Sequence, residues 1–164
     1  MDRSAIIDIQ CVRSNNKSFI VKELAVVSIT HLGVQSVLSF QPPCRREELS
    51  QAVQREICWV ERNLHFIKFE EGLYPYNTLG LFATTLTHPF KYIFAKGVEK
   101  ASFLEDLLQH PVTPLEEYDC PGLNDLPSDI YCNFHKTNRG VCALRNASAL
   151  VNWFSEHPKR LLCA

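Results

Sequence analysis

Three strand-like runs fill residues 5–40, AIIDIQCVRSNNKSFIVKELAVVSITHLGVQSVLSF. The runs are Ala5–Val12, Phe19–Thr30 and Val34–Phe40, and all three are rich in apolar or β-branched residues, which favour strands. A turn containing two asparagines separates the first pair of runs, and a Leu-Gly turn separates the second pair. This pattern predicts an antiparallel, three-stranded meander.

Beyond the meander, helical and strand-like patterns alternate. Apolar residues recur at helical spacing in several segments, and one short apolar run is bounded by Pro and Gly. We expect helices at 46–62, 76–87, 98–109 and 141–157, a strand at 90–95 and a proline-rich loop at 111–140. The order predicts an α/β fold, in which a mixed sheet is flanked by helices, and one domain spanning residues 1–164.

Composition indicates the compartment better than the activity. The formal net charge is −1, so there is no overall attraction to nucleic acid or anionic membrane, and a nucleic-acid surface has to be a local basic patch. No apolar run approaches the ~20 residues of a membrane span. The first ten residues, MDRSAIIDIQ, are unlike a signal peptide, and seven cysteines in an ordinary composition do not suggest a disulfide scaffold. We expect a cytoplasmic or nuclear protein without membrane partners.

Three cysteines and one histidine lie close together near the end of the chain: Cys120, Cys132, His135 and Cys142. The two-residue gap between Cys132 and His135 is the usual short arm of a zinc site, and structural zinc is commonly held by three thiolates and one imidazole. The other spacings match no standard zinc finger. We predict one structural Zn²⁺ that joins the loop 111–140 to the last helix, and the alternative is a set of unconnected buried thiols.

The predicted order of strands and helices resembles the layout of ribonuclease-H-like (RNase H-like) exonucleases with an Asp-Glu-Asp-Asp metal set, which implies an RNase H-like fold. Two motifs also resemble those of this family. AIIDIQ resembles the first motif, and VCALRNASALVNWF resembles the last. The resemblance aligns Asp8 with the first acid, Gln10 with the partner glutamate and Asn146 with the last aspartate, while Glu99 lies in the region of the second motif. That family uses carboxylates to hold two metal ions. With amides at two of four places, the resemblance implies a degenerate, catalytically inactive exonuclease site.

A second resemblance is to the Maelstrom domain of the piRNA pathway, which is also RNase H-like and holds zinc through a Glu-Cys-His-Cys set. The matching pieces are VKELAVV, which contains Glu23, and CNFHKTNRGVCAL, which contains Cys132, His135 and Cys142. The resemblance leaves 41–118 unmatched. It implies Glu23 as the fourth zinc ligand, whereas the residues alone offer Cys120. A charged residue within so apolar a strand requires a partner, which favours Glu23; Cys120 stays the alternative.

Basic residues near aromatic ones are a second candidate feature, because phosphate contact and base stacking together hold single-stranded RNA. The candidates are Lys96, Lys100, Lys136, Arg139 and Arg145. The other interpretation is a solvated basic rim over a core of aromatics. Together with the resemblances, these residues predict a non-catalytic module that binds RNA or a protein of a transposon or small-RNA silencing complex. The alternative is an active nuclease on single-stranded RNA or DNA, which would use Asp8 and Glu99 with Mg²⁺ or Mn²⁺, or cleave RNA without a metal.

Overall fold

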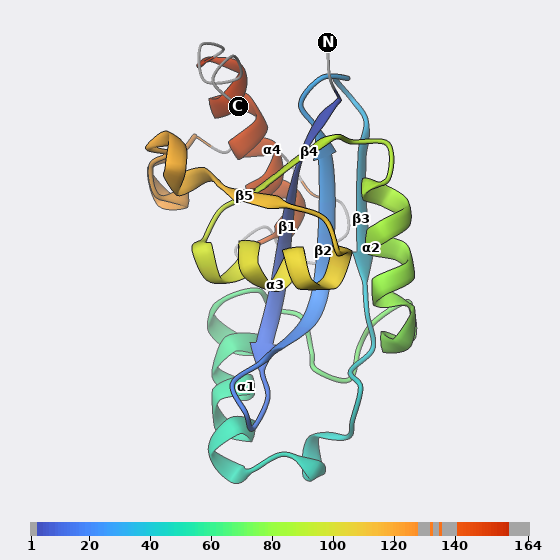
Figure 1. The fold of residues 1–164 in the computed structure, drawn as a ribbon. Helices are drawn as coiled ribbons and strands as arrows, with labels where there is room; N and C mark the ends of the chain where they lie inside the picture. Colours follow the sequence, from blue (N-terminus) through green and yellow to red (C-terminus); the bar gives the residue numbers. More distant parts are fainter. Residues whose placement is uncertain (1–2, 128–131, 133–134, 136–140, 158–164) are drawn as a thin grey trace.

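A five-stranded mixed sheet forms the centre of the computed structural model, which describes residues 3–127, 132, 135 and 141–157. The strand order is β3-β2-β1-β4-β5, so β1 lies in the middle of the sheet (Figure 1). The strands are β1 (Ser4–Arg13), β2 (Phe19–Ser28), β3 (Gln35–Ser39), β4 (Tyr92–Ala95) and β5 (Val112–Pro114).

The predicted meander is confirmed. β1 pairs with β2 antiparallel, and β2 pairs with β3 antiparallel. The register sets Asp8 opposite Ala25 and Glu23 opposite Ser39, and it shifts by a β-bulge between Gln10 and Cys11. A bulge re-aims the side chains that follow it, here at the end of β1 that carries the polar residues.

The other half of the sheet is parallel, and one of its strands was not predicted. β4 pairs with β1, and β5 pairs with β4, both in parallel. The sequence prediction placed β5 inside a loop because Pro111 and Pro114 flank it. Pro114 nevertheless stands opposite Ala95. Since β5 is the last strand of the sheet, a residue without a backbone N–H is tolerated there.

The four helices are α1 (Gln51–Asn63), α2 (Leu79–Thr87), α3 (Val98–Leu108) and α4 (Ala143–Ser155). All four predicted helices are therefore present, with starts later than expected for three of them. The alternation of β1 assigns the faces: Ile6 packs with α4, whereas Ile7 and Ile9 pack with α2 and α3. Helices thus cover both faces of the sheet, and α1 adds a smaller core at one end (Figure 1).

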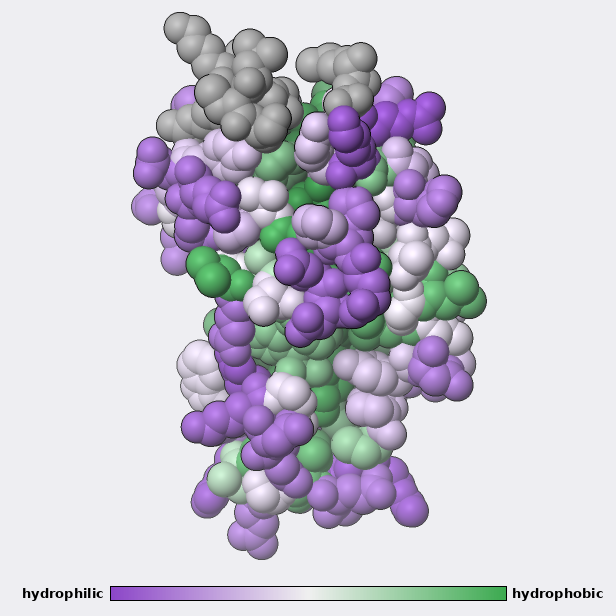
Figure 2. Space-filling view, in the orientation of Figure 1, coloured by the Kyte–Doolittle hydropathy of each residue, from purple (hydrophilic) through white to green (hydrophobic). Residues whose placement is uncertain are grey.

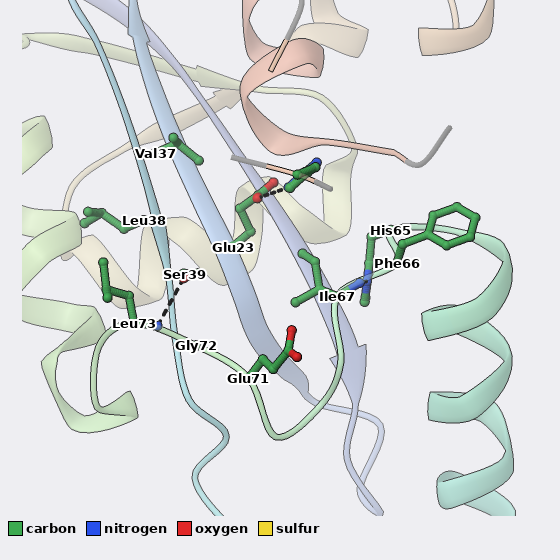
Figure 3. Close-up of a pocket in the computed structure, with 11 residues that line it drawn as sticks. Glu23, Val37, Leu38, Ser39, His65, Phe66, Ile67, Glu71, Gly72 and Leu73 are labelled. Atoms are coloured by element: carbon green, nitrogen blue, oxygen red, sulfur yellow. Dashed lines mark hydrogen bonds and ion pairs between the residues drawn. The ribbon is translucent and has the colours of Figure 1, made fainter. Parts of the chain in front are cut away.

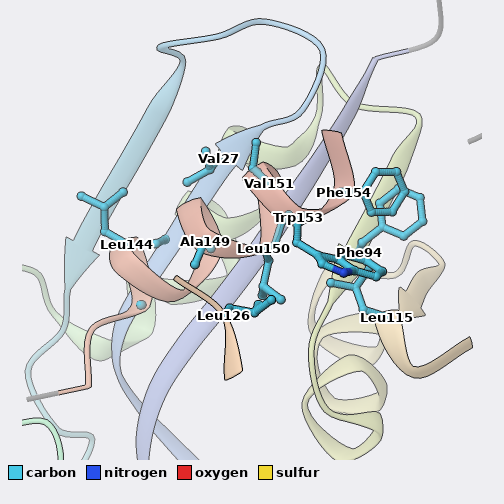
Figure 4. Packing of buried hydrophobic residues seen from close by; sticks show 14 of the residues in the cluster. Val27, Phe94, Leu115, Leu126, Leu144, Ala149, Leu150, Val151, Trp153 and Phe154 are labelled. Carbon is cyan, nitrogen blue, oxygen red and sulfur yellow. The ribbon is translucent and has the colours of Figure 1, made fainter. Parts of the chain in front are cut away.

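α4 is the most deeply buried helix, and it positions the candidate site. Its inward residues, among them Leu150 and Phe154, pack on Val27, Phe94 and Leu115 (Figure 4). Leu150 is fully buried. Figure 2 shows hydrophilic residues over much of the visible face, with hydrophobic patches between them. The N-terminus of α4 therefore has a fixed position against β1 and β2.

Candidate metal centre

Cys132, His135 and Cys142 come together at the N-terminus of α4. Their ligand atoms all lie within 4.8 Å of one another, and both cysteines are only 1% exposed. Ligands of a tetrahedral zinc, at about 2.0–2.3 Å from the ion, would be roughly 3.3–3.8 Å apart. The three groups are therefore close to a coordinating arrangement, and two thiols with an imidazole suit Zn²⁺ better than a hard cation.

Glu23 reaches this group from β2. Its Oε2 lies 2.5 Å from His135 Nε2, and its Oε1 accepts a hydrogen bond of 2.8 Å from the backbone N–H of Ala143. The side chain is almost fully buried. The carboxylate thus contacts both His135 and the positive end of α4, as an anion at a helix N-terminus should. It can act as a fourth ligand or orient the imidazole as a hydrogen-bond acceptor.

Cys120, the alternative fourth ligand, is buried in the core cluster beneath α4. The group of mutually close ligand atoms contains neither the Cys120 sulfur nor a Glu23 oxygen. The Cys120 carbonyl accepts a hydrogen bond of 2.6 Å from Lys96 Nζ. Of the two candidates, Glu23 is the one in direct contact with His135. Most of the loop 111–140 after residue 127 lies outside the described residues.

The thiol of Cys142 is held in its protonated form. Burial raises the pKa of Cys142 to about 12, and the nearby carboxylate of Glu23 adds to the effect. The sulfur accepts a weak hydrogen bond of 3.5 Å from the backbone N–H of Arg145, so Cys142 caps α4. A bound divalent cation would lower the pKa of the Cys142 thiol, against the effect of burial, because thiolate is the form that ligates metal.

Asp8 occupies a second buried polar site, on the α4 face of β1. Lys100 Nζ lies 2.8 Å from its Oδ1, while Asn146 Nδ2 and Gln10 Nε2 lie 3.0 and 3.3 Å from its Oδ2. Asp8 is 1% exposed. Although burial disfavours the ammonium, the charge and hydrogen bond of Asp8 raise the pKa of Lys100 above its usual value. The structure therefore joins Asp8, Gln10 and Asn146, and adds a cation that the sequence prediction had assigned to an RNA surface.

Glu99, the other candidate acid, lies apart from Asp8. Its two carboxylate oxygens accept hydrogen bonds of 2.7 and 2.8 Å from Arg13, at an exposed position. Adjacent helix residues point in different directions, so Lys100 reaches Asp8 while Glu99 faces outward. The ion pair lowers the pKa of Glu99, so this carboxylate is ionised and already paired at neutral pH.

Of the candidate basic residues that the structure describes, two interact with groups inside the protein. Lys96 pairs with Glu116 at 3.1 Å and donates to the carbonyl of Cys120, and Lys100 bonds to Asp8. Arg145 is half-buried on α4. The remaining two candidates, Lys136 and Arg139, lie outside the described residues. Lys96 and Lys100 therefore form contacts within the protein rather than an exposed rim that could bind phosphate.

A hollow of about 230 Å³ lies beside the metal centre (Figure 3). Its polar lining residues are Glu23, Ser39, His65, Glu71 and His135, and the rest of the lining comes from β3 and 66–73. His65 is 2% exposed, and its Nδ1 accepts a hydrogen bond of 3.0 Å from the N–H of Ile67. Burial lowers the pKa of His65 to about 4, so the ring is neutral.

Lys22 is a buried polar position that the sequence prediction missed. It precedes Glu23 on β2 and is fully buried, with Nζ 2.6–2.7 Å from the carbonyl oxygens of Phe40, Phe69 and Glu71. Burial lowers the pKa of Lys22 to about 8. The ammonium thereby fastens the segment that forms one wall of the hollow. A lysine within an apolar run was the available signal, because such a charge needs partners.

No protein-family model and no curated protein sequence matches this chain. Among the described residues, no helix is long and apolar enough to cross a membrane. The arrangement around Cys132, His135 and Cys142 is thus characterised by its own chemistry: a group that could hold a metal ion, with soft ligands and a buried carboxylate beside them.

Proposed function

We propose that the chain is a non-catalytic RNase H-like module, similar to a Maelstrom domain, that binds RNA or a protein partner in transposon or small-RNA silencing. The strand order supports the fold assignment, because an antiparallel meander joined to two parallel strands agrees with the layout expected for that family. The fold alone does not define the function, which depends on the chemistry of the sites.

The observation that carries the non-catalytic assignment is that the carboxylate of Asp8 is already bonded to other side chains of the protein. Both of its oxygens accept hydrogen bonds, one from an ammonium and one from two side-chain amides. A two-metal nuclease needs several free carboxylates around two divalent ions. Here a single carboxylate is neutralised by Lys100, and the other candidate, Glu99, is committed to Arg13.

A nuclease assay tests this assignment. Labelled single-stranded RNA and DNA are incubated with the protein in Mg²⁺, in Mn²⁺ and in a chelator, and we expect full-length substrate throughout. Shortening in metal that Asp8→Ala abolishes would establish the active-nuclease alternative. Shortening that persists in the chelator would establish metal-independent cleavage, and either result overturns the proposal.

The second part of the proposal is a structural zinc held by Cys132, His135 and Cys142, with Glu23 as the fourth ligand. The donor set supports this assignment, since its three atoms already lie within 4.8 Å and Glu23 contacts the imidazole. When bound, zinc would supply a fixed link between β2, the segment around residues 132–135 and the start of α4. Such a link contributes directly to folding free energy.

Elemental analysis of the purified protein tests the zinc. We expect near-stoichiometric zinc in the wild type and its loss in Cys132→Ser, while Cys44→Ser, which removes a half-buried thiol elsewhere, keeps it. Comparing Glu23→Ala with Cys120→Ala then identifies the fourth ligand. A well-folded wild type containing no zinc would reject this part of the proposal.

A protein partner is favoured by one feature of the sheet. β3 is an edge strand, and its pairing with β2 turns the backbone groups of Gln35 and Val37 outward. Val37 and its neighbours also line the hollow beside the metal centre. An edge strand next to such a hollow can accept an extended peptide as an additional strand.

A further inference from the structure

The exposed face of α1 carries an aromatic side chain between two arginines. Trp59 is 57% exposed, although tryptophan is among the side chains with most to gain from burial. Arg55 precedes it by four residues and Arg62 follows it by three, and both are exposed. Residues three and four apart are neighbours on a helix, so the three side chains form one stripe.

The two guanidinium groups of this stripe are free to bind an anion. Among the residues that the structure describes, neither Arg55 nor Arg62 forms an ion pair, whereas Arg13 pairs with Glu99 and Arg46 pairs with Glu61 and Glu70. Glu61, on the same helix as the stripe, is turned toward Arg46 at 2.5 Å. The other acid of α1, Glu56, is exposed and lines a different hollow, together with Trp59 and Arg13.

Beside the stripe lies an open hollow of about 610 Å³. It is lined by the two arginines, the Trp59 ring, one thiol and three side-chain amides, and by no carboxylate. Amides can hydrogen-bond base edges, arginines contact phosphates, and an exposed indole stacks on a base. Helix geometry sets the two guanidinium-bearing positions about 10 Å apart along the axis, with the ring between them.

We infer that the Arg55–Trp59–Arg62 stripe of α1 is a binding platform for single-stranded RNA, in which a base stacks on Trp59 and the arginines hold the flanking phosphates. The inference rests on the proposed binding function and identifies RNA as its ligand. It places the nucleic-acid surface on α1 and assigns it no contact with Lys96 or Lys100. Charge complementarity selects the ligand, since the hollow presents cationic groups and no anionic one.

Fluorescence anisotropy with a short labelled oligouridylate at low salt tests the platform. Trp59→Ala should weaken binding about tenfold, and Trp59→Phe, which keeps a ring, should weaken it less. Arg55→Gln and Arg62→Gln should each reduce the slope of log affinity against log salt by about 0.7. Lys91→Gln is the matched control, because it removes one exposed positive charge at the far end of β4 and should leave binding unchanged.

Intrinsic fluorescence gives an independent readout. The only other tryptophan, Trp153, lies on α4 and is 8% exposed, so RNA should quench Trp59 and leave the emission of Trp59→Phe unchanged. Wild-type binding that all four α1 variants preserve would overturn the platform and leave RNA binding elsewhere. No RNA retention by the wild type at low salt would overturn the platform and leave a protein as the partner, whereas RNA shortening would overturn the non-catalytic assignment instead.

Discussion

The ammonium group of Lys100 on α3 lies 2.8 Å from Oδ1 of Asp8 on β1, inside the protein. In the proposed assignment, Asp8 is the carboxylate that would bind a divalent cation in an active nuclease, and here it is paired with Lys100. Asp8 is 1% exposed and the Lys100 side chain is 25% exposed, so water screens the pair only in part. The positive charge beside Asp8 is the ammonium of Lys100, which belongs to the chain itself. An active nuclease would instead bind a metal ion from solution.

Removing this ammonium should destabilise the fold. Lys100→Met leaves the buried carboxylate with only amide donors, and we expect a loss of about 2–4 kcal/mol in chemical unfolding, since one member of a buried ion pair is lost. The double variant Asp8→Asn with Lys100→Met should recover most of this loss. Equal destabilisation by the single and double variants would show that the pair is not coupled.

Lys22 predicts a pH dependence of stability. Its pKa in the folded protein, about 8, lies below the unfolded value of 10.5, so the unfolded chain binds more protons between these pH values and stability should rise with pH in this window. Relative to Lys22→Met, the wild type should gain about 3 kcal/mol from pH 8 to 10.5. Urea unfolding of both proteins across this range measures the difference, and a constant difference would contradict the prediction.

Lys22→Met should also loosen the segment that its ammonium holds. The carbonyls of Phe69 and Glu71 lose their buried donor, so amide hydrogens of 69–74 should exchange faster while those of α4 stay protected. Hydrogen exchange read by mass spectrometry distinguishes the segments. Unchanged protection of 69–74 would mean that packing alone holds this wall of the hollow.

Chelation should lower the stability of the wild type selectively. A ligand that binds only the folded state stabilises it, so adding a strong chelator should reduce the melting temperature of the zinc-loaded protein by several degrees. Cys142→Ser should melt lower and respond little to chelator. Cys44→Ser should respond as the wild type does, and an equal response of both variants would exclude a role of Cys142 in holding metal.

Packing beneath α4 should contribute independently of the metal. Leu150 is fully buried between α4 and the sheet, and Leu150→Ala should cost about 2–5 kcal/mol of unfolding free energy. Its zinc content, measured under native conditions, should match the wild type. Loss of zinc in a Leu150→Ala protein that remains folded would instead mean that helix packing sets the ligand geometry.

Local patterns predicted most of the elements because each is encoded by neighbouring residues. The meander at residues 5–40 and the four helices follow from apolar periodicity and turn residues, and the structure contains them. β5 escaped prediction because its prolines argue against a strand, and only its place at the sheet edge makes them tolerable. The bulge at Gln10 likewise depends on pairing with β2 and has no local signature.

The candidate site likewise has some features that are local in the sequence and others that depend on tertiary packing. The sequence by itself determined the ligand chemistry, since the Cys132-x2-His135 spacing and Cys142 at a helix start are local features. Only the tertiary structure decided that Glu23 rather than Cys120 contacts the imidazole, and that Lys100 turns inward to Asp8. Residue types set which groups can bind an ion or a charge, whereas their pairing across 92 or 112 positions of the chain depends on how the sheet and helices pack.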